Sequence, residues 1–170
     1  MDTLWTALVA HLEERAEYFR LFDRHRIRPD PWLKVEALRV VSDARRSGGV
    51  RDVRPDRQGC DLWFSTGDDA CWLATRGLIT SYAGAGREAR PTIAAVEEVA
   101  REMDKLRGLA TLAGGSPALL LAAFAFGPEP RERSEWAAQL LRFEAKGFTV
   151  ADNRALPLGA DREGRLYLFR

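Results

Sequence analysis

Apolar residues in the first third of the chain recur with the period of an α-helix. Along residues 3–22 they return every three or four positions, which predicts one helix whose buried face contains Leu4, Trp5, Leu8, Val9, Leu12, Ala16 and Phe19. The segment 24–31 interrupts this pattern, and Asp30 with Pro31 can begin a second helix. The apolar stripe of that helix is predicted to contain Trp32, Val35, Leu38 and Val41, with Val40 beside it, before the glycines at 48 and 49 end it.

Strand patterns occupy residues 50–77. Residues 50–56 alternate between apolar and charged side chains, and two short apolar runs within residues 60–77 flank Gly67-Asp68, which favours a two-residue hairpin turn. That turn places Trp63 opposite Trp72 and leaves Cys60 and Cys71 out of register, so no disulfide is expected. Because side chains alternate along a strand, one face is predicted to hold Asp61, Trp63, Trp72, Ala74 and Arg76, and the other Cys60, Leu62, Phe64, Cys71, Leu73 and Thr75.

The second half of the chain alternates helices and strands. Residues 91–110 predict an amphipathic helix beginning at Pro91, residues 117–126 predict a strand buried on both faces, and residues 134–147 predict a helix capped by Ser134. Two late strands, 148–153 and 164–170, are expected to pair antiparallel across a polar loop. The order α-α-β-β-β-α-β-α-β-β predicts one α/β (α+β) domain over residues 1–170, with a central mixed β-sheet flanked by helices.

Composition narrows the classes of function. The chain has 170 residues and a formal net charge of +1, so no global charge attracts it to nucleic acid or to a membrane. It lacks an apolar run of the ~20 residues needed to span a bilayer, and its start lacks the features of a signal peptide. With only two cysteines, we expect a cytoplasmic protein with reduced thiols and no membrane partner.

Positive charge is concentrated between residues 20 and 57. This stretch holds eleven Arg and Lys side chains against six Asp and Glu side chains. Such an excess is typical of a surface that faces phosphates, and the nucleic-acid-binding candidates are Arg45, Arg46, Arg51, Arg54 and Arg57. The alternative is that these arginines are scattered surface charges without a ligand.

One part of the chain resembles a known enzyme superfamily. A helix with Glu36 in WLKVEALRVV, a meander with Asp61 in CDLWF, the strand WLATRG, the helix EEVAREMDKLRG and the apolar strand LLLAAFAF follow in order. This succession resembles the core of the PD-(D/E)xK nucleases over residues 32–126. The resemblance implies a restriction-endonuclease-like αβββαβ core, to which an N-terminal helix (3–22) and a C-terminal helix and strands (134–170) are added.

The resemblance also implies a site, and the site departs from the family's pattern. In active members an acid of the second strand and the glutamate of an E-x-K triplet bind Mg²⁺ with help from a helix glutamate, and the lysine steadies the attacking water or the phosphate. Glu36 and Asp61 match two of the acids, but Ala74 and Arg76 stand where the third acid and the lysine belong. The resemblance thus implies a degenerate catalytic site of Glu36, Asp61 and Arg76. If a metal site survives, Asp61 and Glu36 would hold Mg²⁺; otherwise no cofactor is expected.

Simpler explanations exist for the same residues. Glu36 can be a surface residue that pairs with Lys34 or Arg39, and Asp61 can form a structural ion pair with Arg76 across the hairpin. Trp63 and Trp72 can stack on bases or, more commonly, form part of a core or interface. The two histidines, His11 and His25, follow no ligand spacing and are expected at the surface.

Three functions follow from these alternatives. The first is a nuclease-fold protein that no longer cuts, is therefore not an enzyme, and serves as a binding or assembly subunit for nucleic acid or a partner protein. The second is an interaction or immunity-type protein that can form a homodimer and has no nucleic-acid role. The third is a Mg²⁺-dependent nuclease in which Glu36 and Asp61 are joined by a migrated acid such as Glu97 or Glu98.

Overall fold

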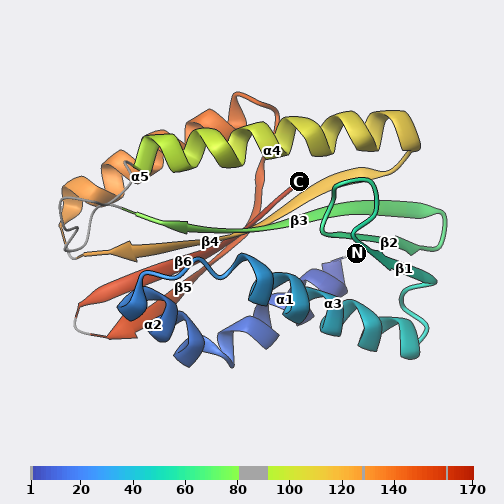
Figure 1. Cartoon of the computed structure of the whole chain (residues 1–170), viewed down its shortest axis with the longest axis horizontal. Helices are drawn as coiled ribbons and strands as arrows, with labels where there is room; N and C mark the ends of the chain where they lie inside the picture. The colour runs from blue at the N-terminus through green and yellow to red at the C-terminus, as the bar shows by residue number, and fades with distance from the viewer. Residues whose placement is uncertain (1, 81–91, 128, 160) are drawn as a thin grey trace.

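The chain folds into a six-stranded mixed sheet with helices on both faces (Figure 1). The computed structural model describes residues 2–80, 92–127, 129–159 and 161–170. In chain order the elements are α1 (Asp2–Glu13), α2 (Ala16–His25), α3 (Asp30–Arg46), β1 (Asp52–Pro55), β2 (Leu62–Thr66), β3 (Asp69–Ile79), α4 (Thr92–Ala113), β4 (Ser116–Phe126), α5 (Pro130–Glu144), β5 (Val150–Gly159) and β6 (Arg162–Phe169). The predicted α+β class and mixed sheet are confirmed.

The sheet has the strand order β1-β2-β3-β4-β6-β5. Of the strand pairs among the described residues, only β3–β4 is parallel, because α4 crosses from the end of β3 back to the start of β4. The remaining neighbours are antiparallel, including β5 and β6 as the sequence predicts. β4 therefore lies inside the sheet, which explains its continuous apolar sequence: Leu119 and Leu121 face one side and Leu120 and Phe124 the other.

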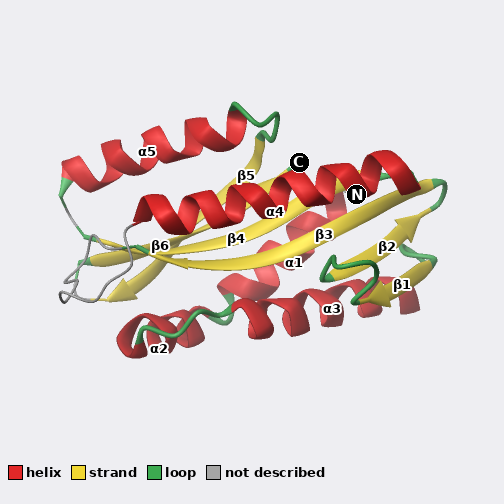
Figure 2. Ribbon diagram, turned by 45° about the horizontal axis from the view of Figure 1, so that its top comes forward, coloured by secondary structure: helices red, strands yellow, loops and turns green. Residues whose placement is uncertain are grey.

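Helices cover the sheet in two layers (Figure 2). One face is covered by α1, α2 and α3, and the core there, called the α3-side core, includes Leu8, Leu12, Phe19, Leu33, Val41, Phe64, Leu73, Leu120 and Leu166. The other face is covered by α4 and α5, and the core there, called the α4-side core, includes Trp72, Ala74, Val99, Met103, Leu121, Trp136, Phe143 and Tyr167.

The predicted helix over residues 3–22 is instead two helices, α1 and α2. The α-helical hydrogen bonding ends near Glu14, where the Arg15 N–H reaches the Leu12 carbonyl. The break lets each half cover a different part of the sheet: α1 packs against α3, whereas α2 packs against β5. The buried face was predicted correctly apart from Ala16, which is only partly buried.

The apolar stripe of α3 is rotated from its predicted position. Leu33, Ala37, Val40 and Val41 face the core, whereas Val35 is 60% exposed. Trp32 is half-buried because its ring packs sideways against Phe19 and Phe22 of α2, with centroids 5.2 and 5.3 Å away. The small Ala37, absent from the predicted stripe, lies on the core side.

Several boundaries also differ from prediction. The helix α5 begins at Pro130, and Ser134 is not its cap but donates from Oγ to the Pro130 carbonyl. β5 continues to Gly159, because Leu156 and Leu158 alternate into the α3-side core where a polar loop was expected. Pro91, the predicted start of α4, lies outside the described residues.

The hairpin of β2 and β3 has the predicted register. Thr66 pairs with Asp69 and Trp63 with Trp72, and both cysteines are free. Cys60 is the exception to the predicted faces: it precedes β2 and packs in the α4-side core rather than beside Leu62. Within the described residues, no helix combines the length and apolarity that crossing a membrane requires.

Candidate functional site

Asp61 lies just before β2 and bonds to β3. Its Oδ2 accepts hydrogen bonds from the Thr75 backbone N–H at 2.7 Å, from Thr75 Oγ1 at 3.2 Å and from Arg76 Nη1 at 2.6 Å. The pairing of β2 with β3 ends at Leu62 and Leu73, so β2 has no backbone carbonyl opposite the Thr75 N–H. This N–H donates to the Asp61 side chain instead. The predicted Asp61–Arg76 ion pair is confirmed.

Arg76 connects this carboxylate to the helix above it. Its Nη2 lies 3.4 Å from Glu102 Oε2 of α4, and Glu102 lies 3.3 Å from Lys105 Nζ. The side chains of Asp61 and Arg76 are 19% and 18% exposed, so the pair is largely shielded from water. We call Asp61, Thr75, Arg76 and Glu102 the Asp61 cluster. Its charges alternate in sign from Asp61 through Arg76 to Glu102, and Lys105 outside the cluster lies next to Glu102.

Ala74 occupies the position that the resemblance gives to a metal-binding acid. It is 1% exposed and lies in the α4-side core with Val99 and Met103. Beside it the Trp72 indole N–H donates to the Gly114 carbonyl at 2.8 Å, which ties the hairpin to the end of α4. A carboxylate at position 74 would be buried among apolar side chains, where its charge would be costly.

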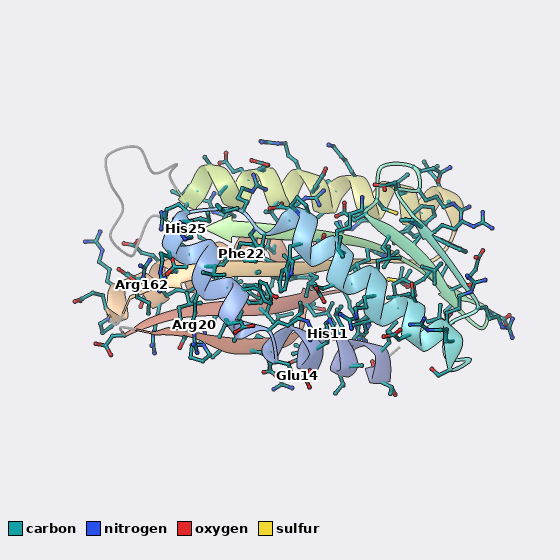
Figure 3. All side chains as sticks on the ribbon, turned by 60° about the horizontal axis from the view of Figure 1, so that its bottom comes forward. His11, Glu14, Arg20, Phe22, His25 and Arg162 are labelled. Carbon is teal, nitrogen blue, oxygen red and sulfur yellow. The ribbon has the colours of Figure 1, made fainter. Side chains whose placement is uncertain are left out.

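Glu36 belongs to the opposite layer. It extends from α3, and its Oε2 lies 2.5 Å from His11 Nε2 and 3.3 Å from Arg15 Nε. The predicted partners Lys34 and Arg39 are wrong, since Lys34 pairs with Asp56. The expectation that His11 is a surface residue is also wrong: its side chain is 16% exposed and is held by Glu36, whereas His25 is exposed. Figure 3 shows His11 on α1, on the α3 side of the sheet.

The residues present do not fit a magnesium site. Asp61 Oδ2 is taken by three donors, and Glu36 lies in the other layer. Glu98 pairs with Arg28 at 3.1 Å and Glu97 lies 3.8 Å from Arg142, so both acids suggested as migrated ligands have cationic partners. Among the described residues, no three His, Cys, Asp or Glu side chains gather as metal ligands.

The five candidate arginines extend from the end of α3 to the turn after β1. Arg45 and Arg46 end α3, Arg51 and Arg54 belong to the β1 region, and Arg57 precedes β2. Three of them have carboxylate neighbours: Arg46 pairs with Asp43, Arg51 lies 3.8 Å from Asp68, and Arg54 lies 2.9 Å from Asp52. The hydrogen bond from Arg54 lowers the pKa of Asp52. We call the five residues the arginine surface.

Arg57 packs on the two tryptophans of the hairpin. Its guanidinium carbon lies 4.4 Å from the Trp63 ring centroid and 5.3 Å from that of Trp72. Arg54 approaches Trp63 as well, at 5.4 Å. Trp72 is fully buried and Trp63 is partly buried, with the two rings edge to face at 6.3 Å. The tryptophans therefore hold arginines in place and do not form a bare stacking platform.

A groove between α1 and α3 was not anticipated from the sequence. Its volume is about 650 Å³, within the range of small-molecule sites. Small residues at helical spacing leave this space: Thr3 and Ala7 on α1, Ala44 at the end of α3 and Ser47 just after it. That spacing is a signal the sequence does contain. Glu102 was also missed, although it borders the apolar stripe of α4.

A scan of protein-family models, a search of curated proteins and a search of solved structures each found no match to this chain. The Asp61 cluster and the arginine surface are therefore the features from which a function can be inferred.

Proposed function

We propose that this protein is a binding subunit that does not cleave its ligand and that has a framework like that of the PD-(D/E)xK nucleases. Support for the framework comes from the strand order β1-β2-β3-β4, with β4 parallel to β3. Further support comes from α3 on one face of these strands and α4 on the other (Figure 2). These elements follow one another in the αβββαβ order that the resemblance implies.

The closed Asp61 cluster is the observation that supports a protein without cleavage activity. A divalent cation at Asp61 would have to displace the Arg76 guanidinium, which stays positively charged at every physiological pH. The cation would then lie beside that charge with Asp61 and Glu102 as the carboxylates of the cluster, and without Glu36. Ala74 supplies no further ligand, and the packing of α4 leaves no room for one. We infer that the described residues around Asp61 do not activate water.

We infer that the ligand is nucleic acid, bound through its phosphates by the arginine surface. Ion pairs between exposed side chains contribute about 0–1 kcal/mol each, so phosphates can replace Asp43, Asp52 and Asp68 at little cost. Arg57 lies against Trp63 with its orientation restricted, so it loses little freedom when it binds. Binding of this kind does not depend on base sequence and weakens with salt.

A protein partner is the second candidate, and the same ion pairs favour it. Three of the five arginines already have carboxylate neighbours, and the chain carries a net charge of only +1. A surface that carries both signs of charge can also bind a protein partner with complementary charges.

Binding distinguishes the two candidates. Fluorescence anisotropy of short labelled single-stranded and double-stranded DNA and RNA would be measured across salt concentrations for wild type, Arg54→Gln and Arg57→Gln. Arg131→Gln, an exposed arginine of α5 on the other layer, is the matched control. We expect each variant of the arginine surface, but not the control, to weaken binding and to reduce the salt slope by about 1. No binding by the wild type would favour the protein partner.

Cleavage tests the central part of the proposal. Supercoiled plasmid and single-stranded RNA would be incubated with the protein and millimolar Mg²⁺ or Mn²⁺, with Asp61→Asn alongside. We expect no cleavage from either form. Metal-dependent cleavage that Asp61→Asn abolishes would overturn the proposal.

A further inference from the structure

One edge of the sheet is an open strand. Among the described strands, β5 is the last in the order and hydrogen-bonds only to β6. It has ten residues, whereas the strand at the opposite edge, β1, has four. An edge strand presents a row of backbone N–H and C=O groups that can pair with another strand.

The register shows which backbone groups point outward. Thr149 and Arg170 exchange both backbone hydrogen bonds, at 2.9 and 3.1 Å, and an extra residue is accommodated between Val150 and Asp152. Hydrogen-bonded pairs alternate along an antiparallel ladder, so Asp152 and Arg154 direct their backbone groups toward β6. Asn153 and Ala155 therefore direct theirs away from the sheet.

The far end of β5 is closed to a new strand. Pro157 has no N–H, and its carbonyl accepts a hydrogen bond from Arg20 Nε of α2 at 3.2 Å (Figure 3). Within Ala151–Ala155 there is no proline, and every one of these residues except Asp152 is exposed. The open part of the edge is thus this five-residue segment, which we call the β5 edge.

We propose that the β5 edge pairs with the β5 edge of a second copy of this chain, antiparallel about a two-fold axis at Asn153. In this register the backbone groups of Asn153 bond to those of Asn153 in the second copy. Ala151 and Ala155 pair with Ala155 and Ala151 of that copy. Asn153 and Ala155 are outward-facing positions, and Ala151 is the extra residue that has no partner in the β5–β6 register, so the two six-stranded sheets join without disturbing that ladder.

Charge complementarity identifies the occupant as a second copy. Asp152 and Arg154 lie on either side of Asn153 and form a partly exposed pair within the chain at 3.4 Å. The two-fold axis places Asp152 directly opposite Arg154 of the second copy, and does so twice. A strand without this symmetric charge pattern would gain the backbone bonds but not both ion pairs. The interface involves only the five-residue β5 edge of each copy, so the dimer is expected to be weak and concentration-dependent.

Sedimentation velocity over a range of protein concentrations tests the proposal. We expect the wild type to dimerise as concentration rises. Asn153→Pro removes an outward N–H that β6 does not use, so the variant should fold, as checked by circular dichroism, and remain monomeric. Arg154→Asp places carboxylates opposite each other and should weaken association by about tenfold or more.

The charge-exchanged variant Asp152→Arg/Arg154→Asp is the decisive control, because it restores opposite charges across the axis. Recovery of dimerisation in this variant supports the proposal even if Asn153→Pro fails to fold. A wild type that stays monomeric at every concentration would overturn it. A dimer that neither Asn153→Pro nor Arg154→Asp weakens would also overturn it. So would a loss of dimerisation in Arg154→Asp that the charge-exchanged variant does not restore.

Discussion

The carboxylate of Asp61 and the guanidinium of Arg76 lie 2.6 Å apart, and Arg76 is next to Glu102 of α4, where the nuclease resemblance expects a metal between acids. The same oxygen accepts the Thr75 N–H, and Arg76 continues to Glu102. The positively charged Arg76 guanidinium thus lies next to the Asp61 carboxylate, which would hold a metal. This relationship underlies the account of the protein as a binder that does not cleave.

Removing Asp61 should destabilise the fold. In Asp61→Ala the partly buried Arg76 and the Thr75 N–H both lose their acceptor, and we expect a loss of about 2–4 kcal/mol in the free energy of unfolding. Urea unfolding of Asp61→Ala, Arg76→Ala and the double variant measures the coupling. The two losses should be strongly non-additive, because either change breaks the same pair. Additive losses would show that the two residues act independently.

Glu36 should matter for stability and not for metal binding. In Glu36→Gln the carboxylate charge facing His11 and Arg15 disappears, and we expect a loss of about 1–2 kcal/mol, measured by urea unfolding. Arg39→Gln is the control, since Arg39 is exposed on the same helix, and should change stability by less than about 0.5 kcal/mol. Equal effects of the two substitutions would contradict the inferred role of Glu36.

Gly77 is needed because α3 begins against β3. A Cβ at this position would lie 2.1 Å from Cδ and 2.6 Å from Cγ of Pro29, so Gly77→Ala should cost about 3 kcal/mol or more. Gly108, inside α4, has open space around it, and Gly108→Ala should stabilise by about 0.5–1 kcal/mol. Thermal unfolding of both variants checks the contrast. An unchanged unfolding temperature in Gly77→Ala would contradict this, because it would mean that Pro29 moves aside without cost.

Both thiols should be unreactive in the folded protein. Burial raises the pKa of Cys71 to about 12, and burial with the nearby charge of Asp61 raises that of Cys60 to about 11. Reaction with a thiol reagent at neutral pH is therefore expected to follow unfolding. Rapid labelling of either cysteine under native conditions would contradict this.

The same shifts predict a dependence of stability on alkaline pH. The pKa values of the folded thiols lie above the ordinary value of 9.0, so the thiols contribute fully to the free energy of unfolding below pH 9. This contribution is lost as the pH rises from 9 through about 11, because the thiols of the unfolded chain ionise at a lower pH than those of the folded chain. A Cys60→Ala/Cys71→Ala variant should show a shallower decline than wild type over this range in urea unfolding.

The hairpin could be predicted from the sequence because local rules determine it. Gly67-Asp68 sets the turn, alternation sets the faces, and the ion pair of Asp61 with Arg76 follows from that register. The doubly buried β4 was equally predictable, since its apolar run is continuous. Cys60 departed from its predicted face because it lies outside the regular strand, where alternation no longer applies.

Relationships between distant elements could not be predicted in this way. The partners of Glu36 depend on how α1 lies along α3, and helical periodicity does not determine that packing. The rotation of α3 reflects its docking on the sheet and against α2. The exposed β5 edge exists because β6 inserts between β4 and β5, a choice of strand order that the sequence pattern of either strand does not reveal.

Calorimetric titration of Mg²⁺ and Mn²⁺ into the wild type and Asp61→Asn tests the central claim most directly. The closed Asp61 cluster predicts no specific heat of binding for either metal in either protein. Stoichiometric binding by the wild type that disappears in Asp61→Asn would show that Asp61 holds a metal in spite of Arg76, and would contradict the account.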